Sequence, residues 1–193
     1  MRRMELSTRT RRTQRGMSLI ELLIALTVLT VGLAALIGLM MTGITSNARN
    51  KLDTGATLSA QAILETIAAQ PNGTSVTMTD CAGNVFTVQT ASPAVGSSPN
   101  NSGADLLSSN TGIDFLGQTN ANVPTGYKTL YVGCGPSGNH VTYDVRWNIQ
   151  TITAYSRLIT VGAQQIQAVK AQENAIQYFN PPVNLRTISA SGN

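Results

Sequence analysis

The chain has 193 residues, of which 42% are hydrophobic and 11% are charged, and its formal net charge is +4. This length allows one modest domain besides a long apolar segment and argues against a pair of catalytic domains. The positive charge resides in residues 1–16, where six arginines and one glutamate give +5, so the rest of the chain carries −1. Because that rest lacks a basic cluster with aromatic residues, the composition argues against nucleic-acid binding.

An apolar run covers residues 19–41 and contains a single charged residue, Glu21. At about 1.5 Å per helical residue it spans roughly 35 Å, more than the ~30 Å hydrocarbon core of a bilayer, so it is predicted to cross a membrane once. Arginines beside an apolar span hold that flank in the cytoplasm, which places the N-terminus inside and the bulk of the chain outside. The run is longer than that of a secretory signal peptide and ends at Met40 and Met41 instead of a small-residue cleavage site.

Glu21 is the feature that a plain single-pass anchor does not explain. An ionised carboxylate in an apolar span costs at least ~2.5 kcal/mol on insertion scales, so we expect it to have a partner. The alternative is a carboxylate that reaches the lipid headgroups without any partner.

The residues around Glu21 resemble the processing motif of type IV prepilins and of the pseudopilins of type II secretion. The string is Gly16-Met17-Ser18-Leu19-Ile20-Glu21, followed by Leu22-Leu23-Ile24-Ala25. The resemblance implies that residues 1–16 are a leader peptide, that prepilin peptidase cuts after Gly16, and that Met17 becomes a methylated N-terminus. It also implies that Glu21 is the glutamate needed for filament assembly.

The next turns of the helix most resemble minor pilins of the PilV type, through Leu33-Ala34-Ala35-Leu36-Ile37-Gly38-Leu39 after Val31-Gly32. Two departures from the family are Met17, where phenylalanine is commonest, and the missing proline that kinks many major pilin helices. The resemblance implies partners in other pilins, major and minor, in prepilin peptidase and in the inner-membrane assembly platform. It implies no metal and no organic cofactor. It places the precursor in the inner membrane and the mature chain in a surface pilus or a periplasmic filament.

Cleavage after Gly16 would expose an ammonium on Met17, four residues before Glu21. This spacing puts both groups on one helical face, where the start of the helix also favours a carboxylate. Between chains, the ammonium of an incoming subunit could neutralise Glu21 of its neighbour inside an apolar filament core, where a missing partner is costly. The sequence therefore suggests a charge pair that sets the axial register.

The helix is predicted to cover residues 17–70, because the first proline is Pro71 and apolar or small residues continue at helical spacing. Its second half is amphipathic and is expected to turn one face to a globular head. The opposite, solvent-facing side should carry Arg49, Lys51, Asp53 and Glu65.

Residues 71–193 are predicted to form a β-rich head outside the cytoplasm. Alternating or strand-rich segments predict strands at 75–79, 85–90, 128–133, 140–153 and 157–161. The period of two places one set of side chains on a single face toward the helix, with Trp147 as a core anchor: Val141, Tyr143, Val145, Trp147 and Ile149. With the long helix, these strands predict an α+β fold, pilin-like, in which the helix packs on an antiparallel β-sheet.

Three segments of the head are less regular. Residues 92–126 are rich in turn-forming residues and are predicted to be a long loop, either surface decoration or a contact surface at a pilus tip. Residues 164–178 suggest a glutamine-rich terminal helix or a segment draped over the sheet. The tail 187–193 is expected to be mobile.

Both cysteines, Cys81 and Cys134, fall in the part predicted to be exported, where an even count favours one disulfide. Such a bond would tie the first hairpin to the main sheet. The alternatives are two unpaired core residues or a metal site, and a site is hard to complete because the only histidine is His140.

The sequence displays no catalytic constellation, since His140 beside Gly138-Asn139 is better read as a turn residue than as a base, and the acids are scattered. A non-enzymatic minor pilin that supports pilus assembly, adhesion, twitching motility or DNA uptake is therefore the leading interpretation. The alternatives are a pseudopilin of a type II secretion system and a single-pass anchored periplasmic binding domain that is never processed.

Overall fold

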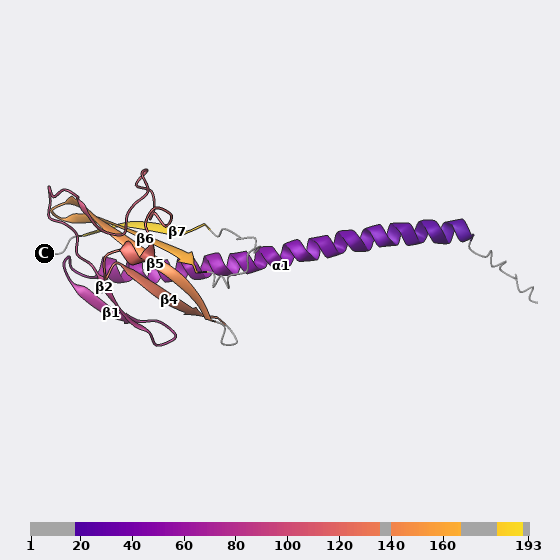
Figure 1. The fold of residues 1–193 in the computed structure, drawn as a ribbon, viewed down its shortest axis with the longest axis horizontal. Coiled ribbons are helices and arrows are strands. Elements are labelled where there is room, and N and C mark those ends of the chain that lie inside the picture. Colours follow the sequence, from indigo (N-terminus) through magenta and orange to yellow (C-terminus); the bar gives the residue numbers. More distant parts are fainter. Residues whose placement is uncertain (1–17, 136–139, 167–180, 191–193) are drawn as a thin grey trace, which may run out of the picture. The chain divides into compact units, whose positions relative to one another are not determined.

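The computed structural model describes residues 18–135, 140–166 and 181–190 (Figure 1). Its elements are, in chain order, α1 (Leu19–Ala69), β1 (Ser75–Thr79), β2 (Val85–Gln89), β3 (Asn101–Gly103), the 3₁₀ helix η1 (Asn120–Asn122), β4 (Lys128–Cys134), β5 (His140–Thr153), β6 (Ser156–Gln165) and β7 (Val183–Ala190). The chain divides between Ser46 and Asn47 into two compact units. The first holds the N-terminal half of α1, and the second, called the head from here on, holds the C-terminal half of α1 together with the strands. A long helix and antiparallel sheets confirm the predicted α+β class.

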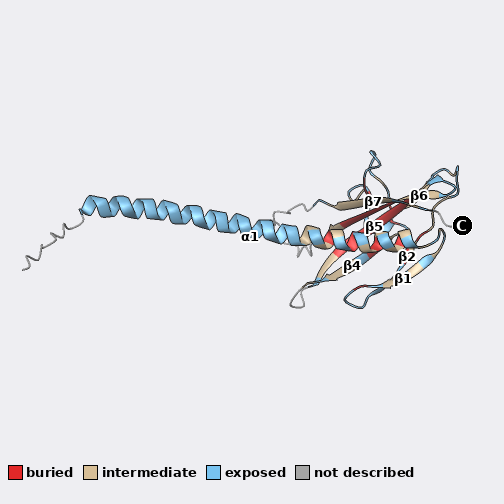
Figure 2. Ribbon diagram, turned by 180° about the vertical axis from the view of Figure 1, so that it is seen from behind, coloured by how far each residue is buried: buried red, intermediate tan, exposed pale blue. Residues whose placement is uncertain are grey.

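α1 is one helix of 51 residues that ends just before Pro71, as predicted. Within the head its buried side chains recur at helical spacing: Ala56, Ser59, Ala60, Ile63 and Ile67. Lys51 and Glu65 are exposed and Asp53 is half-buried. Figure 2 shows this change along the helix, from exposed residues to a face that is buried against the sheet. Tertiary packing of this face, more than helix propensity, stabilises the second half of α1.

The main sheet is antiparallel and has five strands in the order β3-β5-β6-β7, with β4 also paired to β5. β5 is its central strand because it pairs β6 on one edge and both β3 and β4 on the other. β1 and β2 form a separate two-stranded antiparallel sheet. The predicted strands 75–79 and 140–153 coincide with β1 and β5, and the predicted strand 157–161 lies inside the longer β6.

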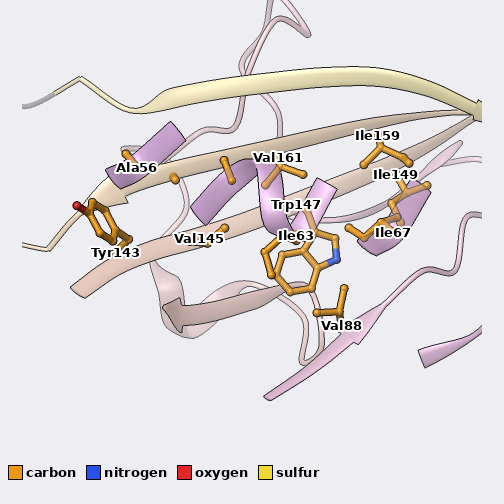
Figure 3. Close-up of a cluster of buried hydrophobic side chains, with 12 residues drawn as sticks. Ala56, Ile63, Ile67, Val88, Tyr143, Val145, Trp147, Ile149, Ile159 and Val161 are labelled. Atoms are coloured by element: carbon orange, nitrogen blue, oxygen red, sulfur yellow. The ribbon is translucent and has the colours of Figure 1, made fainter. Parts of the chain in front are cut away.

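The core lies between α1 and the main sheet (Figure 3). Tyr143, Val145, Trp147 and Ile149, from one face of β5, are at most 3% exposed and pack with Ile63 and Ile67 of α1. Trp147 is fully buried and its indole Nε1 donates to the carbonyl of Gln89 at 3.0 Å. The predictions that this face meets the helix and that Trp147 is a core anchor are confirmed. Burying each large side chain contributes about 1.5–3 kcal/mol.

The prediction that 92–126 is only a loop is wrong in part. The segment contains β3, η1 and an isolated bridge between Leu106 and Ile113, and it has its own apolar cluster of Ala104, Ile113 and Val123. Its apolar islands are too short to show a period, so this burial could not be predicted from local pattern. Pairing with β5 and packing on the sheet order the segment instead.

Residues 92–126, called the insertion from here on, cover the second face of β5, which carries polar residues. Arg146 forms an ion pair with Asp144 at 2.6 Å, donates to the carbonyl of Gln118, and lies 4.6 Å from the centre of the Phe115 ring. Asn148 Nδ2 donates to the carbonyl of Ala104 at 2.6 Å. β5 is therefore buried on both faces. Its Asp144, Arg146 and Asn148 Nδ2 groups have partners there, as buried polar groups generally do, whereas Asn148 Oδ1 has none among the described residues.

Arg157, at the start of β6, is fully buried and reaches across the core to α1. Its guanidinium donates to the carbonyl of Ile67 at 2.8 Å, to the carbonyl of Gln70, and to the carbonyl of Thr90 at 2.8 Å. Burial lowers the pKa of this guanidinium. The last turn of α1 has no basic residue of its own, so Arg157 supplies the cation that the helix C-terminus favours.

The structure describes only part of the two C-terminal segments for which predictions were made, 164–178 and 187–193. Gln164 and Gln165 end β6, and the greater part of the predicted 164–178 segment lies outside the described residues. The expectation of a mobile tail from Thr187 is wrong for residues 187–190, which belong to β7 and pair with β6, Ala190 opposite Ser156. The hydrogen bonds of this ladder order an otherwise polar segment.

Candidate functional site

The first half of α1 exposes a continuous apolar surface. All residues from Ser18 to Lys51 are exposed, and the large apolar side chains between Leu19 and Ile44 are 51–82% exposed. The helix is long and apolar enough to cross a membrane, with a mean hydropathy of 2.6 over its most apolar 18-residue window. An exposed apolar surface of this extent requires lipid or an apolar partner chain to cover it.

The threonines of this segment satisfy their hydroxyl groups within the helix. Thr27 donates to the carbonyl of Ile24 at 2.8 Å, and Thr42 donates to the carbonyl of Leu39 at 2.9 Å. Thr30 and Thr45 donate to helix carbonyls in the same way. Since hydrocarbon offers no hydrogen bonds, this arrangement lets the helix sit among apolar neighbours without unpaired hydroxyls.

Glu21 lies in the first turn of α1, where the Ser18 carbonyl accepts from the Glu21 amide at 3.0 Å and from the Leu22 amide at 3.2 Å. It is the only charged residue in the described chain before Arg49. Among the residues that the structure describes, none forms a hydrogen bond or ion pair with the Glu21 carboxylate. The carboxylate is thus available to a group outside these residues, and the helix start favours its negative charge.

The two predicted processing residues, Gly16 and Met17, lie outside the described residues. The predicted cut and methylation, and the assembly role of Glu21, therefore stay predictions. The structure places Glu21 in the first turn of α1, on a stretch of helix whose other exposed residues are uncharged as far as Arg49.

Residues 11–37 match a family model described as the prokaryotic N-terminal methylation motif. The match covers the end of the arginine-rich N-terminal segment, Gly16, Glu21 and the first part of α1, and it does not extend into the head. It supports a prepilin-type pilin or pseudopilin that a peptidase processes and that assembles with other pilins. No curated protein and no solved structure matches the chain.

Cys81 and Cys134 form a disulfide with an S–S distance of 2.08 Å. The bond joins the β1–β2 turn to the end of β4 and so links the two sheets across 53 residues. In the chain-entropy account, closing a loop of this length stabilises the fold by about 4 kcal/mol.

Asp80, next to the disulfide, is a structural residue that the sequence interpretation missed. Its carboxylate accepts from the amides of Ala82 and Asn84 at 3.0 and 2.8 Å, from Asn84 Nδ2 at 2.9 Å, and from the Val132 amide of β4 at 3.1 Å. Burial raises the pKa of Asp80, but these hydrogen bonds outweigh it and hold the pKa below its usual value. The available signal was the turn sequence Asp-Cys-Ala-Gly-Asn, since aspartate favours the start of such turns.

We expect Asp80→Asn to lower the free energy of unfolding by about 1–3 kcal/mol at pH 7, because an amide NH₂ would face N–H donors. The folded-state pKa is depressed, so this stabilisation is complete above the unfolded pKa of about 4 and is lost as the pH falls through the folded pKa. Urea unfolding from pH 3 to 7, followed by Trp147 fluorescence, measures the free energy of unfolding of the parent protein and of Asp80→Asn. The difference between the two should shrink at low pH. Asp105→Asn, at an exposed position, is the control; a constant difference across this range would contradict the role of Asp80.

His140 is the first residue of β5 and is exposed, so the interpretation as a turn residue is wrong. It lies opposite Cys134 in the β4–β5 ladder, with Nδ1 3.4 Å from the Cys134 sulfur. The sequence alone could not place it there, because the pairing depends on the register of the two strands.

Proposed function

We propose that this chain is a minor pilin that joins a type IV pilus. Prepilin peptidase cuts after Gly16, Met17 becomes the methylated N-terminus, and the apolar half of α1 anchors the precursor in the membrane before it packs among other pilins. The observation that carries the proposal is an exposed apolar half-helix with one charge, Glu21, inside a methylation motif. The head then faces outward, and the pilus supports adhesion, motility or DNA uptake.

The charge of Glu21 gives the filament an axial register. The ammonium of Met17 on an incoming subunit neutralises Glu21 of its neighbour, since the described residues supply no partner for this carboxylate. Within an apolar core such a pair is strongly favoured over two separated charges.

A pseudopilin of a type II secretion system is the second candidate, because the same motif and the same apolar helix serve it equally well. The resemblance of residues 31–39 to minor pilins of the PilV type favours the pilus. Within a pilus, the absence of a proline before Pro71 argues more against a major pilin than against a minor one. Recovery of the chain in filaments sheared from the cell surface supports the pilus, whereas a chain confined to the periplasm supports the pseudopilus.

Mass analysis of the mature protein tests the processing. We expect loss of residues 1–16 and one added methyl group on Met17, while cells that lack the prepilin peptidase should retain the full leader. A chain that carries its intact Met1 terminus in normal cells and still functions would contradict processing. It would leave only an anchored periplasmic domain.

A further inference from the structure

The only histidine of the chain and its only two cysteines meet at one place in the head. The β4–β5 ladder places His140 directly opposite Cys134, and the β1–β2 turn brings Cys81 to the same point. Directly opposite residues in antiparallel strands have Cβ atoms about 4.5–5.5 Å apart, close enough for their side chains to share a ligand.

The three possible ligand atoms, the two sulfurs and a ring nitrogen of His140, all lie within 4.8 Å of one another. A tetrahedral zinc ion with bonds of about 2.3 Å to sulfur and 2.0 Å to nitrogen holds its ligand atoms about 3.5–3.8 Å apart. All three residues are exposed, so an ion can enter from solvent. Small side-chain rotations would therefore complete a three-ligand site once both sulfurs are free.

We propose that the Cys81–Cys134 bond conceals a zinc site that opens on reduction. A thiol reductant transfers two electrons to the disulfide, which yields two thiols and leaves the reductant as its own disulfide. Zn²⁺ then displaces the two thiol protons and binds Cys81 Sγ, Cys134 Sγ and a ring nitrogen of His140, with water in the fourth position. The oxidised head has no free thiolate and does not hold the ion.

The frame around these residues does not depend on the disulfide alone. Asp80 precedes Cys81 and accepts from the amide of Val132, two residues before Cys134, so one hydrogen bond still joins the turn to β4 after reduction. His140 and Cys134 stay opposite each other through the seven paired positions of the β4–β5 ladder. Thiolates and an imidazole form a ligand set that suits zinc better than calcium or magnesium, which prefer oxygen.

The test uses the detergent-solubilised full chain, reduced with a phosphine and titrated with Co²⁺ as a coloured substitute for Zn²⁺. We expect one Co²⁺ per reduced chain, with the visible bands of tetrahedral cobalt and a thiolate charge-transfer band that added Zn²⁺ removes. The oxidised chain and the variant with Cys81→Ser and Cys134→Ser should show neither band. His140→Ala should bind at least about tenfold more weakly, since even the loss of a supporting group costs 10–100-fold.

Trp147 emission, measured in the same samples, reports whether the reduced head is folded, because this side chain is fully buried. A folded reduced chain without the cobalt bands would overturn the proposal. Equal affinity in the His140→Ala variant would overturn it as well, and so would a Trp147 emission typical of an unfolded head, because the site requires the folded ladder. None of these outcomes bears on leader processing or filament assembly, which the mass and filament measurements test separately.

Discussion

Replacing Glu21 by glutamine is expected to reduce incorporation of the processed chain into filaments by roughly 60-fold or more. Glutamine keeps the size of the side chain but removes the charge, so the ammonium of a neighbouring Met17 would have no counter-ion in the apolar core. A lone charge in such surroundings costs at least ~2.5 kcal/mol on insertion scales, and each 1.4 kcal/mol is a factor of ten. The measurement is the ratio of the chain in sheared filaments to the chain in membranes.

Glu65→Gln is the matched control, because Glu65 is the only other glutamate of α1 and is also exposed. It lies in the head and accepts from Gln61 Nε2 at 2.7 Å, a surface hydrogen bond whose weakening should not affect assembly. Mass analysis should show both variants cut and methylated, which separates assembly from processing. If Glu21→Gln entered filaments as well as Glu65→Gln, the charge pair would be excluded as the source of the register.

Replacing Arg157 by methionine is expected to lower the free energy of unfolding of the head by about 3–5 kcal/mol. Methionine fills similar space but removes the guanidinium donor from the carbonyls of Ile67, Gln70 and Thr90, and of these the Ile67 carbonyl keeps the Gln70 amide as a donor at 3.3 Å. Each unsatisfied buried group costs about 1–3 kcal/mol, and loss of one partner from a buried charged interaction costs 3–5 kcal/mol. The C-terminus of α1 would also lose its only cationic contact in the described residues.

Urea unfolding of the detergent-solubilised chain, followed by Trp147 fluorescence, measures this effect. Arg186→Met is the matched control, since Arg186 lies on the neighbouring β7 and is exposed, and exposed substitutions usually change stability by less than about 0.5 kcal/mol. Arg157→Lys should fall between the two, because one ammonium cannot reproduce the fork of the guanidinium. Equal stability of Arg157→Met and Arg186→Met would show that the three carbonyls find other donors or water.

Local patterns predicted the elements that have a strong period. The alternation through Trp147 and Ile149 predicted a strand with one face on the helix, and β5 has this form. The absence of proline before Pro71 predicted the end of α1. These signals lie within a few turns or residues of the chain, so they do not depend on what packs against them.

The contacts that the sequence did not reveal are those between distant segments. In the sequence, Asp144 and Arg146 simply alternate with the apolar residues of β5, yet residues 92–126 bury them both. Arg157 reads as a strand residue, and its role as a cap for α1 comes from carbonyls 67 to 90 residues earlier in the chain. Neither arrangement has a local periodic signal, because each depends on which segments the fold brings together.

The sequence by itself determined that this chain has an apolar, membrane-competent helix with one acid near its start, since hydropathy and charge are properties of contiguous residues. It also favoured a bond between the two cysteines from their number and their predicted compartment. Only the tertiary structure decided that the 92–126 insertion is a packed layer, that β7 orders part of the tail, and that His140 stands beside Cys134. These features depend on strand register and on burial by distant residues, which the fold as a whole sets.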